Sequence, residues 1–187
     1  MKPLVVGIGG STRTGSAGER ALCLSLKAAE EAGAHTRLFN GAFLARIPIY
    51  APESRERTAD QRELVEAVRG ADGLILASPG YHGGISGLVK NALDLLEDLR
   101  NDSRCYLDGR AVGCIITANG WQTVGTALTA LRSIVHALRG WPTPLGAGLN
   151  TAAELFDSSG GCIDQAAAQQ LVIVGRQVTE FAAKWNA

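Results

Sequence analysis

The sequence lacks an excess of charge of either sign. Its 187 residues include 18 Lys and Arg and 18 Asp and Glu, so the formal net charge is zero. A protein that binds nucleic acid or an anionic membrane through its charge needs a basic field. The composition therefore excludes no fold, but it disfavours nucleic acid and membranes as partners.

The sequence also lacks long apolar runs and paired cysteines. No run reaches about 18 uncharged apolar residues, and Met1–Gly7 looks like the start of a strand rather than a signal peptide. The four cysteines, Cys23, Cys105, Cys114 and Cys162, form no Cys-x-x-Cys pair and have no histidine at metal-ligand spacing. We therefore expect a soluble, cytoplasmic protein with reduced thiols and no metal site.

What is present is an alternation of short apolar runs with longer segments of helical periodicity. This pattern is typical of a parallel sheet covered by helices on both faces. The length fits one domain, residues 1–187. We predict a five-stranded, doubly wound parallel sheet of the α/β class, with strands at Leu4–Ile8, His35–Phe39, Gly73–Ala77, Ala111–Thr117 and Thr143–Gly148.

Five helices are expected between and after these strands, and the third has the richest apolar stripe. The stripe runs from Ile85 to Leu99 at spacings of three and four residues. Such a stripe usually packs into the core. Because its apolar positions are numerous, part of this helix is also a candidate for contact with another subunit.

Glycine is abundant and unevenly distributed. Nine of the 23 glycines lie in or next to the loops that follow the first, third and fourth predicted strands: Gly9, Gly10, Gly15, Gly18, Gly80, Gly83, Gly84, Gly87 and Gly120. In doubly wound sheets the ligand binds beyond the carboxyl ends of the strands, where the strand order reverses. These three loops are therefore the expected binding edge.

The first loop, Gly9–Ser16, combines glycines and hydroxyl side chains with one cation, Arg13. Backbone amides, a helix N-terminus, hydroxyls and a guanidinium together suit a phosphate group. Two nucleotide motifs fail here, because Thr12 replaces the third glycine of a dinucleotide fingerprint and Ser16 replaces the lysine of a Walker A loop. We predict a phosphate site; the alternative is an ordinary turn in which Thr14 or Ser16 caps the next helix.

The second loop, Ser78–Gly87, has four glycines and an adjacent Tyr81 and His82. Glycines let the backbone approach a flat ring closely and offer amides to its heteroatoms. For His82 we keep two interpretations open. It is either a loop histidine hydrogen-bonded to backbone or a group with an acid or base role.

Two motifs together carry a resemblance to a known family. Gly-Ser-Thr-Arg-x-x-Ser occupies Gly10–Ser16, and Ser-Pro-x-Tyr-His-Gly-x-Ile-x-Gly-x-x-Lys-Asn-Ala-Leu-Asp occupies Ser78–Asp94. In this order, followed by the third loop Thr117–Trp121, they resemble the NADPH-dependent FMN reductase family of flavodoxin-like proteins. The resemblance extends over essentially the whole chain.

The resemblance implies FMN and NADPH as cofactors. The sequence departs from the family pattern at Gly80, Gly18 and Ser86, where the family often has Glu, Asn and Pro, respectively. The implied cofactor-binding residues are Ser11, Thr12, Arg13 and Ser16 at the phosphate, Pro79, Gly80, Tyr81, His82 and Gly83 along the ring, and Asn119, Gly120 and Trp121 at its pyrimidine edge.

The implied activity is NADPH-dependent reduction. Hydride would pass from NADPH to the flavin N5, and the electrons would pass on to free flavin or to another small acceptor, such as a quinone, an azo dye or a metal oxyanion. The cofactor carries this chemistry, so no side chain is expected to act as a catalytic acid or base. The family also implies a homodimer or homotetramer.

Two other functions stay open. A non-enzymatic FMN electron carrier is disfavoured by the neutral charge, because such carriers are usually strongly acidic. The other is a scaffold that has lost flavin and binds another nucleotide or a protein. Arg46, Arg55 and Arg57 are weak candidates for the 2′-phosphate of NADPH, with solvated surface charge as the alternative.

Overall fold

The computed structural model describes residues 2–54 and 56–185. Its strands are β1 (Leu4–Gly9), β2 (His35–Phe39), β3 (Gly73–Tyr81), β4 (Gly84–Ile85), β5 (Ala111–Ala118), β6 (Trp141–Pro142) and β7 (Ala147–Asn150). Its helices are α1 (Ala17–Glu31), α2 (Gly41–Leu44), α3 (Ala59–Arg69), α4 (Gly87–Asp94), the 3₁₀ helix η1 (Leu95–Leu99), α5 (Trp121–Ala137) and α6 (Gln165–Trp185).

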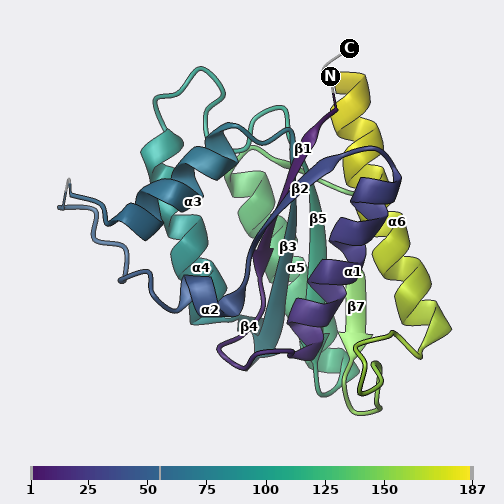
Figure 1. Cartoon of the computed structure of the whole chain (residues 1–187). Helices are drawn as coiled ribbons and strands as arrows, with labels where there is room; N and C mark the ends of the chain where they lie inside the picture. Colours follow the sequence, from purple (N-terminus) through teal and green to yellow (C-terminus); the bar gives the residue numbers. More distant parts are fainter. Residues whose placement is uncertain (1, 55, 186–187) are drawn as a thin grey trace.

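The strands form one sheet with helices on both faces, as predicted. The order is β2-β1-β3-β5, with β6 and β7 side by side with β5, and these neighbours are parallel. Helices α1 and α6 cover one face, and α3, α4 and α5 cover the other (Figure 1). The strand order therefore reverses between β1 and β3, which is the switch point of a flavodoxin-type sheet.

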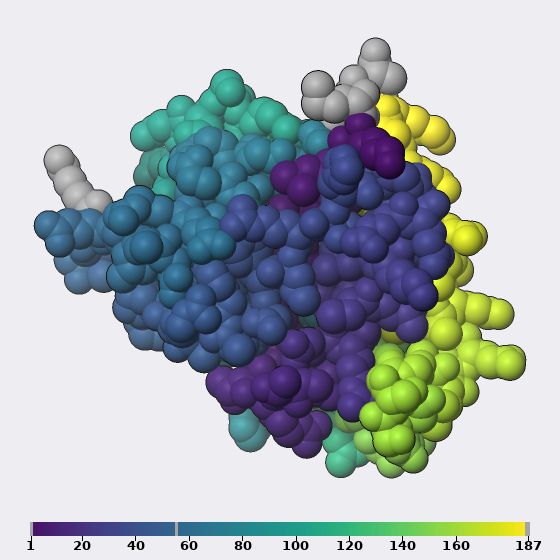
Figure 2. Space-filling model, in the orientation of Figure 1, coloured from purple at the N-terminus to yellow at the C-terminus, as the bar shows by residue number. Residues whose placement is uncertain are grey.

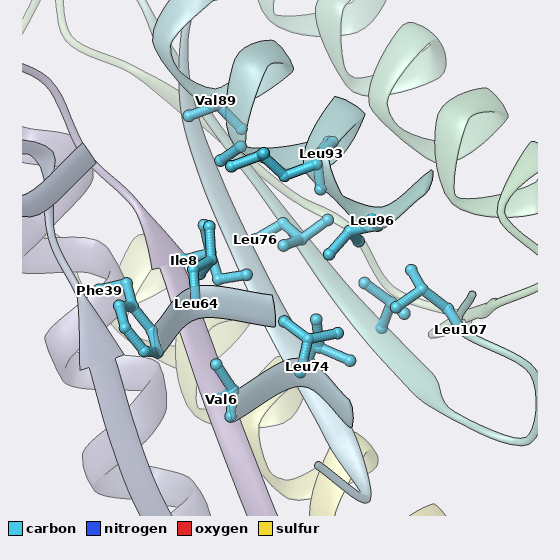
Figure 3. Packing of buried hydrophobic residues seen from close by; sticks show 14 of the residues in the cluster. Val6, Ile8, Phe39, Leu64, Leu74, Leu76, Val89, Leu93, Leu96 and Leu107 are labelled. Atoms are coloured by element: carbon cyan, nitrogen blue, oxygen red, sulfur yellow. The ribbon is translucent and has the colours of Figure 1, made fainter. Parts of the chain in front are cut away.

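The central strands β3 and β5 run through the core. Successive side chains of β1 and β3 alternate between the two faces, so that Val6, Leu74 and Leu76 pack with Leu64 of α3 (Figure 3). The Ile85–Leu99 stripe joins the same cluster: Val89, Ala92, Leu93, Leu95, Leu96 and Leu99 are all buried. The stripe therefore packs mainly within the chain's own core, and it gives little support to the predicted subunit contact.

The prediction of five strands was wrong in detail, because the sheet has seven. Of the expected fifth strand, Thr143–Gly148, only Ala147 and Gly148 are in a strand, β7, and the short strand β6 ends at Pro142, just before the predicted range. Trp141 is in register with Ala111, and Ala147 is in register with Ile115. The outer segment therefore advances six residues where β5 advances four, so two of its residues are extra. Pro144 lies in this interruption and has no N–H to donate to the ladder.

The other additional strand, β4, forms an antiparallel hairpin with the end of β3. The two residues of its turn, His82 and Gly83, have φ of 51° and 84°. Positive φ at both central residues is the signature of a type I′ turn, whose twist matches that of the flanking strands. Part of the predicted second loop is therefore a short, ordered hairpin.

Within the described residues, no helix is long and apolar enough to cross a membrane. Over the same ranges, no three His, Cys, Asp or Glu side chains are grouped so that they could hold a metal ion. The four cysteines carry free thiols. Burial raises the pKa of the Cys114 thiol to about 12, which removes it as a nucleophile at neutral pH.

Candidate functional site

A cavity of about 570 Å³ opens at the carboxyl ends of β1, β3 and β5, and we call it the cleft. It lies at the switch point of the sheet, near β4 at the lower end in Figure 1. The volume is in the range of about 300–1,000 Å³ that is typical of small-molecule sites. The lining residues are Ser11, Thr12, Arg13, Ser16, Ala17, Gly18, Pro79, Gly80, Tyr81, His82, Thr117, Ala118, Asn119, Thr123 and Thr151.

The first loop, residues 10–16, supplies hydroxyl groups at one end of the cleft. Ser16 Oγ accepts the Glu19 N–H at 3.3 Å and caps the N-terminus of α1. A hydroxyl has one donor in addition to its acceptor sites. The cap is therefore the one that the alternative interpretation expected, and it still leaves Ser16 able to donate a hydrogen bond into the cleft.

Positive electrostatic potential gathers at the same end. Ala17 and Gly18 line the cleft at the first two positions of α1, where backbone N–H groups have no acceptor within the helix. The helix dipole adds partial positive charge there. Arg13 is exposed, and its guanidinium has no partner among residues 2–54 and 56–185. These donors form a set that suits a phosphate group.

Glu19 holds the first loop in place, and the sequence analysis did not identify it. Its carboxylate accepts the Gly15 N–H at 2.9 Å and the side-chain amide of Asn40 at 3.1 Å. The available signal was the Ser16-x-x-Glu19 spacing, which is that of a capping box. Here the carboxylate contacts Gly15 rather than the cap residue itself.

Gly41 fixes the loop from its outer side. A Cβ on this first residue of α2 would lie 1.8 Å from the carbonyl oxygen of Ser11. No side chain fits at that distance, so a larger residue would displace the backbone of the first loop. The close contact between α2 and Ser11 therefore depends on glycine.

The second loop supplies an apolar, flat wall. Pro79, Gly80, Tyr81 and His82 line the cleft, whereas Gly83 lies at the tip of the hairpin and does not. Tyr81 is 55% exposed. The His82 imidazole has no hydrogen-bond partner in the described part of the chain, so the interpretation of a histidine bonded to backbone is not supported.

Two of the departures from the family pattern have local explanations in this hairpin. Ser86 donates its backbone N–H to Ser78 Oγ at 2.9 Å and caps α4 by accepting the Val89 N–H. Proline at position 86 would lose the first of these bonds. A Cβ at Gly80 would lie 3.0 Å from Thr123 Cγ2, so a larger residue there requires its neighbours to move.

The third loop is held by Asn150 at the end of β7. Asn150 Oδ1 accepts the Gly120 N–H at 3.1 Å and the Ala152 N–H at 3.0 Å. The Gly120 amide, which was expected at the pyrimidine edge of the ring, is thus already hydrogen-bonded. Asn119 lines the cleft, but Gly120 and Trp121 do not, and Trp121 is 67% exposed at the start of α5.

The structure therefore brings together all the sequence-predicted site residues except Gly83, Gly120 and Trp121. It adds lining residues that the sequence analysis missed, among them Thr117 on β5, Thr123 on α5 and Thr151 after β7. No carboxylate of a described residue lines the cleft. The hydroxyls, amides and single guanidinium at one end and the apolar wall at the other fit the phosphate and the ring of FMN.

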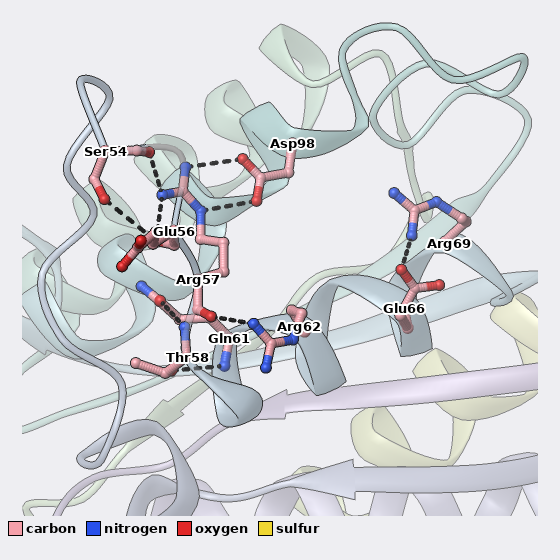
Figure 4. Close-up of polar contacts among 9 residues, drawn as sticks. All are labelled: Ser54, Glu56, Arg57, Thr58, Gln61, Arg62, Glu66, Arg69 and Asp98. Carbon is pink, nitrogen blue, oxygen red and sulfur yellow. Dashed lines mark hydrogen bonds and ion pairs between the residues drawn. The ribbon is translucent and has the colours of Figure 1, made fainter.

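The arginines considered for NADPH are engaged elsewhere. Arg57 makes a two-bond pair with Asp98 at 2.9 and 3.0 Å and donates to Ser54 O at 2.7 Å (Figure 4). Arg46 pairs with Asp60 at 2.9 Å. Arg55 lies outside the described residues. Arg57 thus connects Ser54, which precedes α3, to Asp98 of η1. This side of the molecule is at the left in Figure 2.

Comparison with known proteins places these features in a family. The sequence model described as "NADPH-dependent FMN reductase" matches residues 3–154. The FMN-dependent NADPH-azoreductase of Staphylococcus aureus is 37% identical over 93 residues, which cover 50% of this chain and 46% of that enzyme. The chain thus spans about half the length of the curated relatives it matches.

Solved structures share the fold. FerB, a flavoenzyme NAD(P)H:(acceptor) oxidoreductase from Paracoccus denitrificans, has a TM-score of 0.73 at 19% identity, over 97% of this chain and 98% of that one. An NADH:FMN oxidoreductase in its apo form has a TM-score of 0.68 at 21% identity, over 98% of this chain and 90% of that one. Together with the match over residues 3–154, the fold and the cleft lead to one conclusion: the chain belongs to the NADPH-dependent FMN reductase family.

Proposed function

We propose that the protein is an NAD(P)H-dependent FMN reductase that passes electrons to free flavin or to another small acceptor. The observation that carries the proposal is the composition of the cleft. Hydroxyls, helix amides and Arg13 gather at one end and the Pro79–His82 wall at the other, with no carboxylate of the described residues between them. This composition suits a redox cofactor better than acid–base chemistry.

At the phosphate end, Ser11, Thr12, Arg13 and Ser16 would bind FMN. The phosphate carries close to two negative charges at neutral pH. Arg13 would grip two of its oxygens, while the hydroxyls and the α1 amides would satisfy the remainder. Because Glu19 and Gly41 hold the loop in position, the donors need little reorganisation on binding.

At the ring end, Pro79, Gly80, Tyr81 and His82 would lie along the isoalloxazine and Asn119 would reach its pyrimidine edge. The redox chemistry would come from FMN, by hydride transfer from a reduced nicotinamide nucleotide and onward delivery of electrons to the acceptor. The chain's own task is to align the two rings and to hold hydrogen-bond donors where negative charge develops. Gly83, Gly120 and Trp121 stay in the proposal only as flanking residues.

The acceptor that we favour is small and planar. The exposed Tyr81 ring at the mouth of the cleft gives an aromatic surface for a flavin, a quinone or an azo compound. The azoreductase relative supports this class of acceptor. An electron carrier without reductase activity is less favoured, because the chain has no net charge to steer it to a protein partner.

We further propose one domain over residues 1–187, in the cytoplasm, assembled as a homodimer or homotetramer. One continuous sheet supports the first point, and free thiols support the second. Large exposed apolar side chains, among them Ile49 at 81% and Trp121 at 67%, support association. A monomeric mass in solution at about micromolar concentration would contradict it.

Steady-state turnover tests the proposed reaction. NADPH oxidation is followed with FMN alone, then with FMN and a quinone, then with FMN and an azo dye. We expect oxidation that depends on enzyme and is accelerated by an acceptor. Tight FMN retention without NADPH oxidation would favour the carrier, and the absence of both would favour a scaffold that has lost flavin.

A further inference from the structure

A second polar cavity lies at the opposite end of the sheet from the cleft. It has a volume of about 240 Å³ and is lined by Arg69, Asp102, Ser103, Arg104 and Arg110. Arg69 is the last residue of α3 and Arg110 directly precedes β5, so the cavity lies at the amino ends of the central strands. These ends are at the top of the sheet in Figure 1. We call it the arginine pocket.

Arg110 is fully buried, and its hydrogen-bond partners are all backbone carbonyls, although the carboxylates of Asp72, Asp102 and Asp108 also favour its charged form. Its Nε donates to Ala71 O at 2.9 Å, its Nη2 to Arg69 O at 2.8 Å, and its Nη1 to Tyr106 O at 3.1 Å. Carbonyl oxygens compensate the charge less completely than a carboxylate does. Burial, together with repulsion from Arg104, lowers the pKa of Arg110 to about 10.

Arg104 brings a second guanidinium to the same place. Its Nη1 donates to Ala71 O at 3.3 Å, the oxygen that Arg110 Nε also uses. Its Nη2 is shielded from solvent and has no acceptor among residues 2–54 and 56–185. Asp72 Oδ1 lies 3.9 Å from Nη1 and forms an ion pair with it, but at a distance too long for a hydrogen bond. Two like charges thus converge, and one buried N–H group lacks an acceptor.

Arg69 differs from Arg104 and Arg110 in that its guanidinium is hydrogen-bonded to carboxylates. It pairs with Asp102 at 2.7 Å and also with Glu66, the pair drawn in Figure 4. The buried donor without an acceptor therefore belongs to Arg104, and the guanidinium of Arg110 beside it forms hydrogen bonds only to backbone carbonyls. The pocket holds the volume of several water molecules, at about 30 Å³ each, which is enough for a small ion.

We propose that the arginine pocket binds a small tetrahedral oxyanion of the size of inorganic phosphate or sulfate. Planar guanidinium groups recognise such oxyanions through paired N–H donors. The ion would supply the acceptor that Arg104 Nη2 lacks and would offset the repulsion between Arg104 and Arg110. Because these residues join the end of α3, the start of β3 and the start of β5, binding would stabilise the fold.

Thermal unfolding of the protein saturated with FMN tests the site, because FMN then occupies the phosphate end of the cleft. Inorganic phosphate is the probe, and chloride at matched ionic strength is the reference. A ligand that binds only the folded state raises Tm. At about 20 mM phosphate we expect a rise of about 3 °C in the wild type. Arg104→Ala should abolish the rise, and Arg104→Gln provides a second variant in case the first does not fold.

Two matched controls locate the ion. Arg100→Ala removes one positive charge from a side chain that is 69% exposed and lies outside the pocket, so the rise should persist. Arg13→Ala removes the cation of the cleft, and there too the rise should persist. A general salt effect would raise Tm equally in every variant. That result, or loss of the rise in Arg13→Ala with retention in Arg104→Ala, would overturn the proposal.

Discussion

The two ends of the parallel sheet present positive charge in different ways. At the carboxyl ends, the first loop offers hydroxyls, unpaired α1 amides and an exposed Arg13 that holds no part of the fold. At the amino ends, Arg110 is buried and donates to three carbonyls from two segments, residues 69–71 and Tyr106. An exposed cation is available to a ligand, whereas a buried one mainly stabilises the fold. Replacing an arginine should therefore lower ligand affinity at the carboxyl ends and the free energy of unfolding at the amino ends.

The largest expected effect comes from removing the buried arginine. Arg110→Met leaves the carbonyls of Arg69 and Tyr106 without the donor that they share in Arg110, and it leaves Ala71 O with only the longer bond from Arg104. Each buried acceptor without a partner costs about 1–3 kcal/mol, so we expect the free energy of unfolding to fall by about 3 kcal/mol or more. Urea unfolding measures it. Arg13→Ala is the control and should change the free energy of unfolding by less than about 0.5 kcal/mol. Equal losses in the two variants would contradict the different roles of Arg110 and Arg13.

The next effect concerns ligand affinity. Arg13→Ala should weaken FMN binding by roughly ten to more than a hundred fold, because a charge-assisted contact contributes about 1.5–3 kcal/mol. Fluorescence titration measures the Kd. Riboflavin, which lacks the phosphate, should bind the variant and the wild type equally, and Arg100→Ala should leave the FMN Kd unchanged. An unchanged FMN Kd in Arg13→Ala would show that the phosphate lies elsewhere.

The smallest effect concerns a carboxylate beside the cleft. Asp157 accepts the Ser159 hydroxyl at 2.6 Å and the backbone N–H groups of Ser159 and Gly161, and these bonds lower the pKa of its carboxyl group. Residues 151–162 lie next to the first loop at the lower edge of Figure 2, and Arg20 joins them by donating to Asp157 O at 2.7 Å.

Because the folded-state pKa of Asp157 is depressed, its contribution is present above the unfolded-state value and is lost as the pH falls through the folded-state one. We expect the protection factor of the Gly161 amide, which is its exchange rate relative to the intrinsic rate at the same pH, to fall on acidification. Asp157→Asn should show the lower protection factor already at neutral pH. Global Tm should change little, because the carboxylate orders only its own loop. A large fall in Tm would assign it a structural role like that of Arg110.

The sequence predicted the carboxyl end of the sheet well and the amino end not at all. Ser11, Arg13 and Tyr81 lie in contiguous motifs that can be recognised from the sequence alone. Arg69, Arg104 and Arg110 converge only after α3, the loop and β5 have packed, so no local pattern indicated them. The same holds for Asn150, which reaches Gly120 across 30 positions of the chain.

Within the fold, the misjudged elements have local causes. The expected strand Thr143–Gly148 is a strand only at Ala147 and Gly148, because Pro144 lies in the run and two extra residues fall between the β6 and β7 registers with β5. The β3–β4 hairpin was expected as open loop, since positive φ at His82 is unusual for a residue other than glycine. The periodicity of apolar residues located the core strands, but it contains no information on turns of this kind.

The most direct test of the account is anaerobic reduction of the FMN-loaded protein. NADPH is added without any acceptor, and the visible absorbance of the flavin is recorded. We expect a yellow protein whose absorbance is lost on addition of NADPH and returns when an acceptor such as a quinone is admitted. A protein that binds no FMN, or one whose colour persists with NADPH and NADH alike, would contradict it.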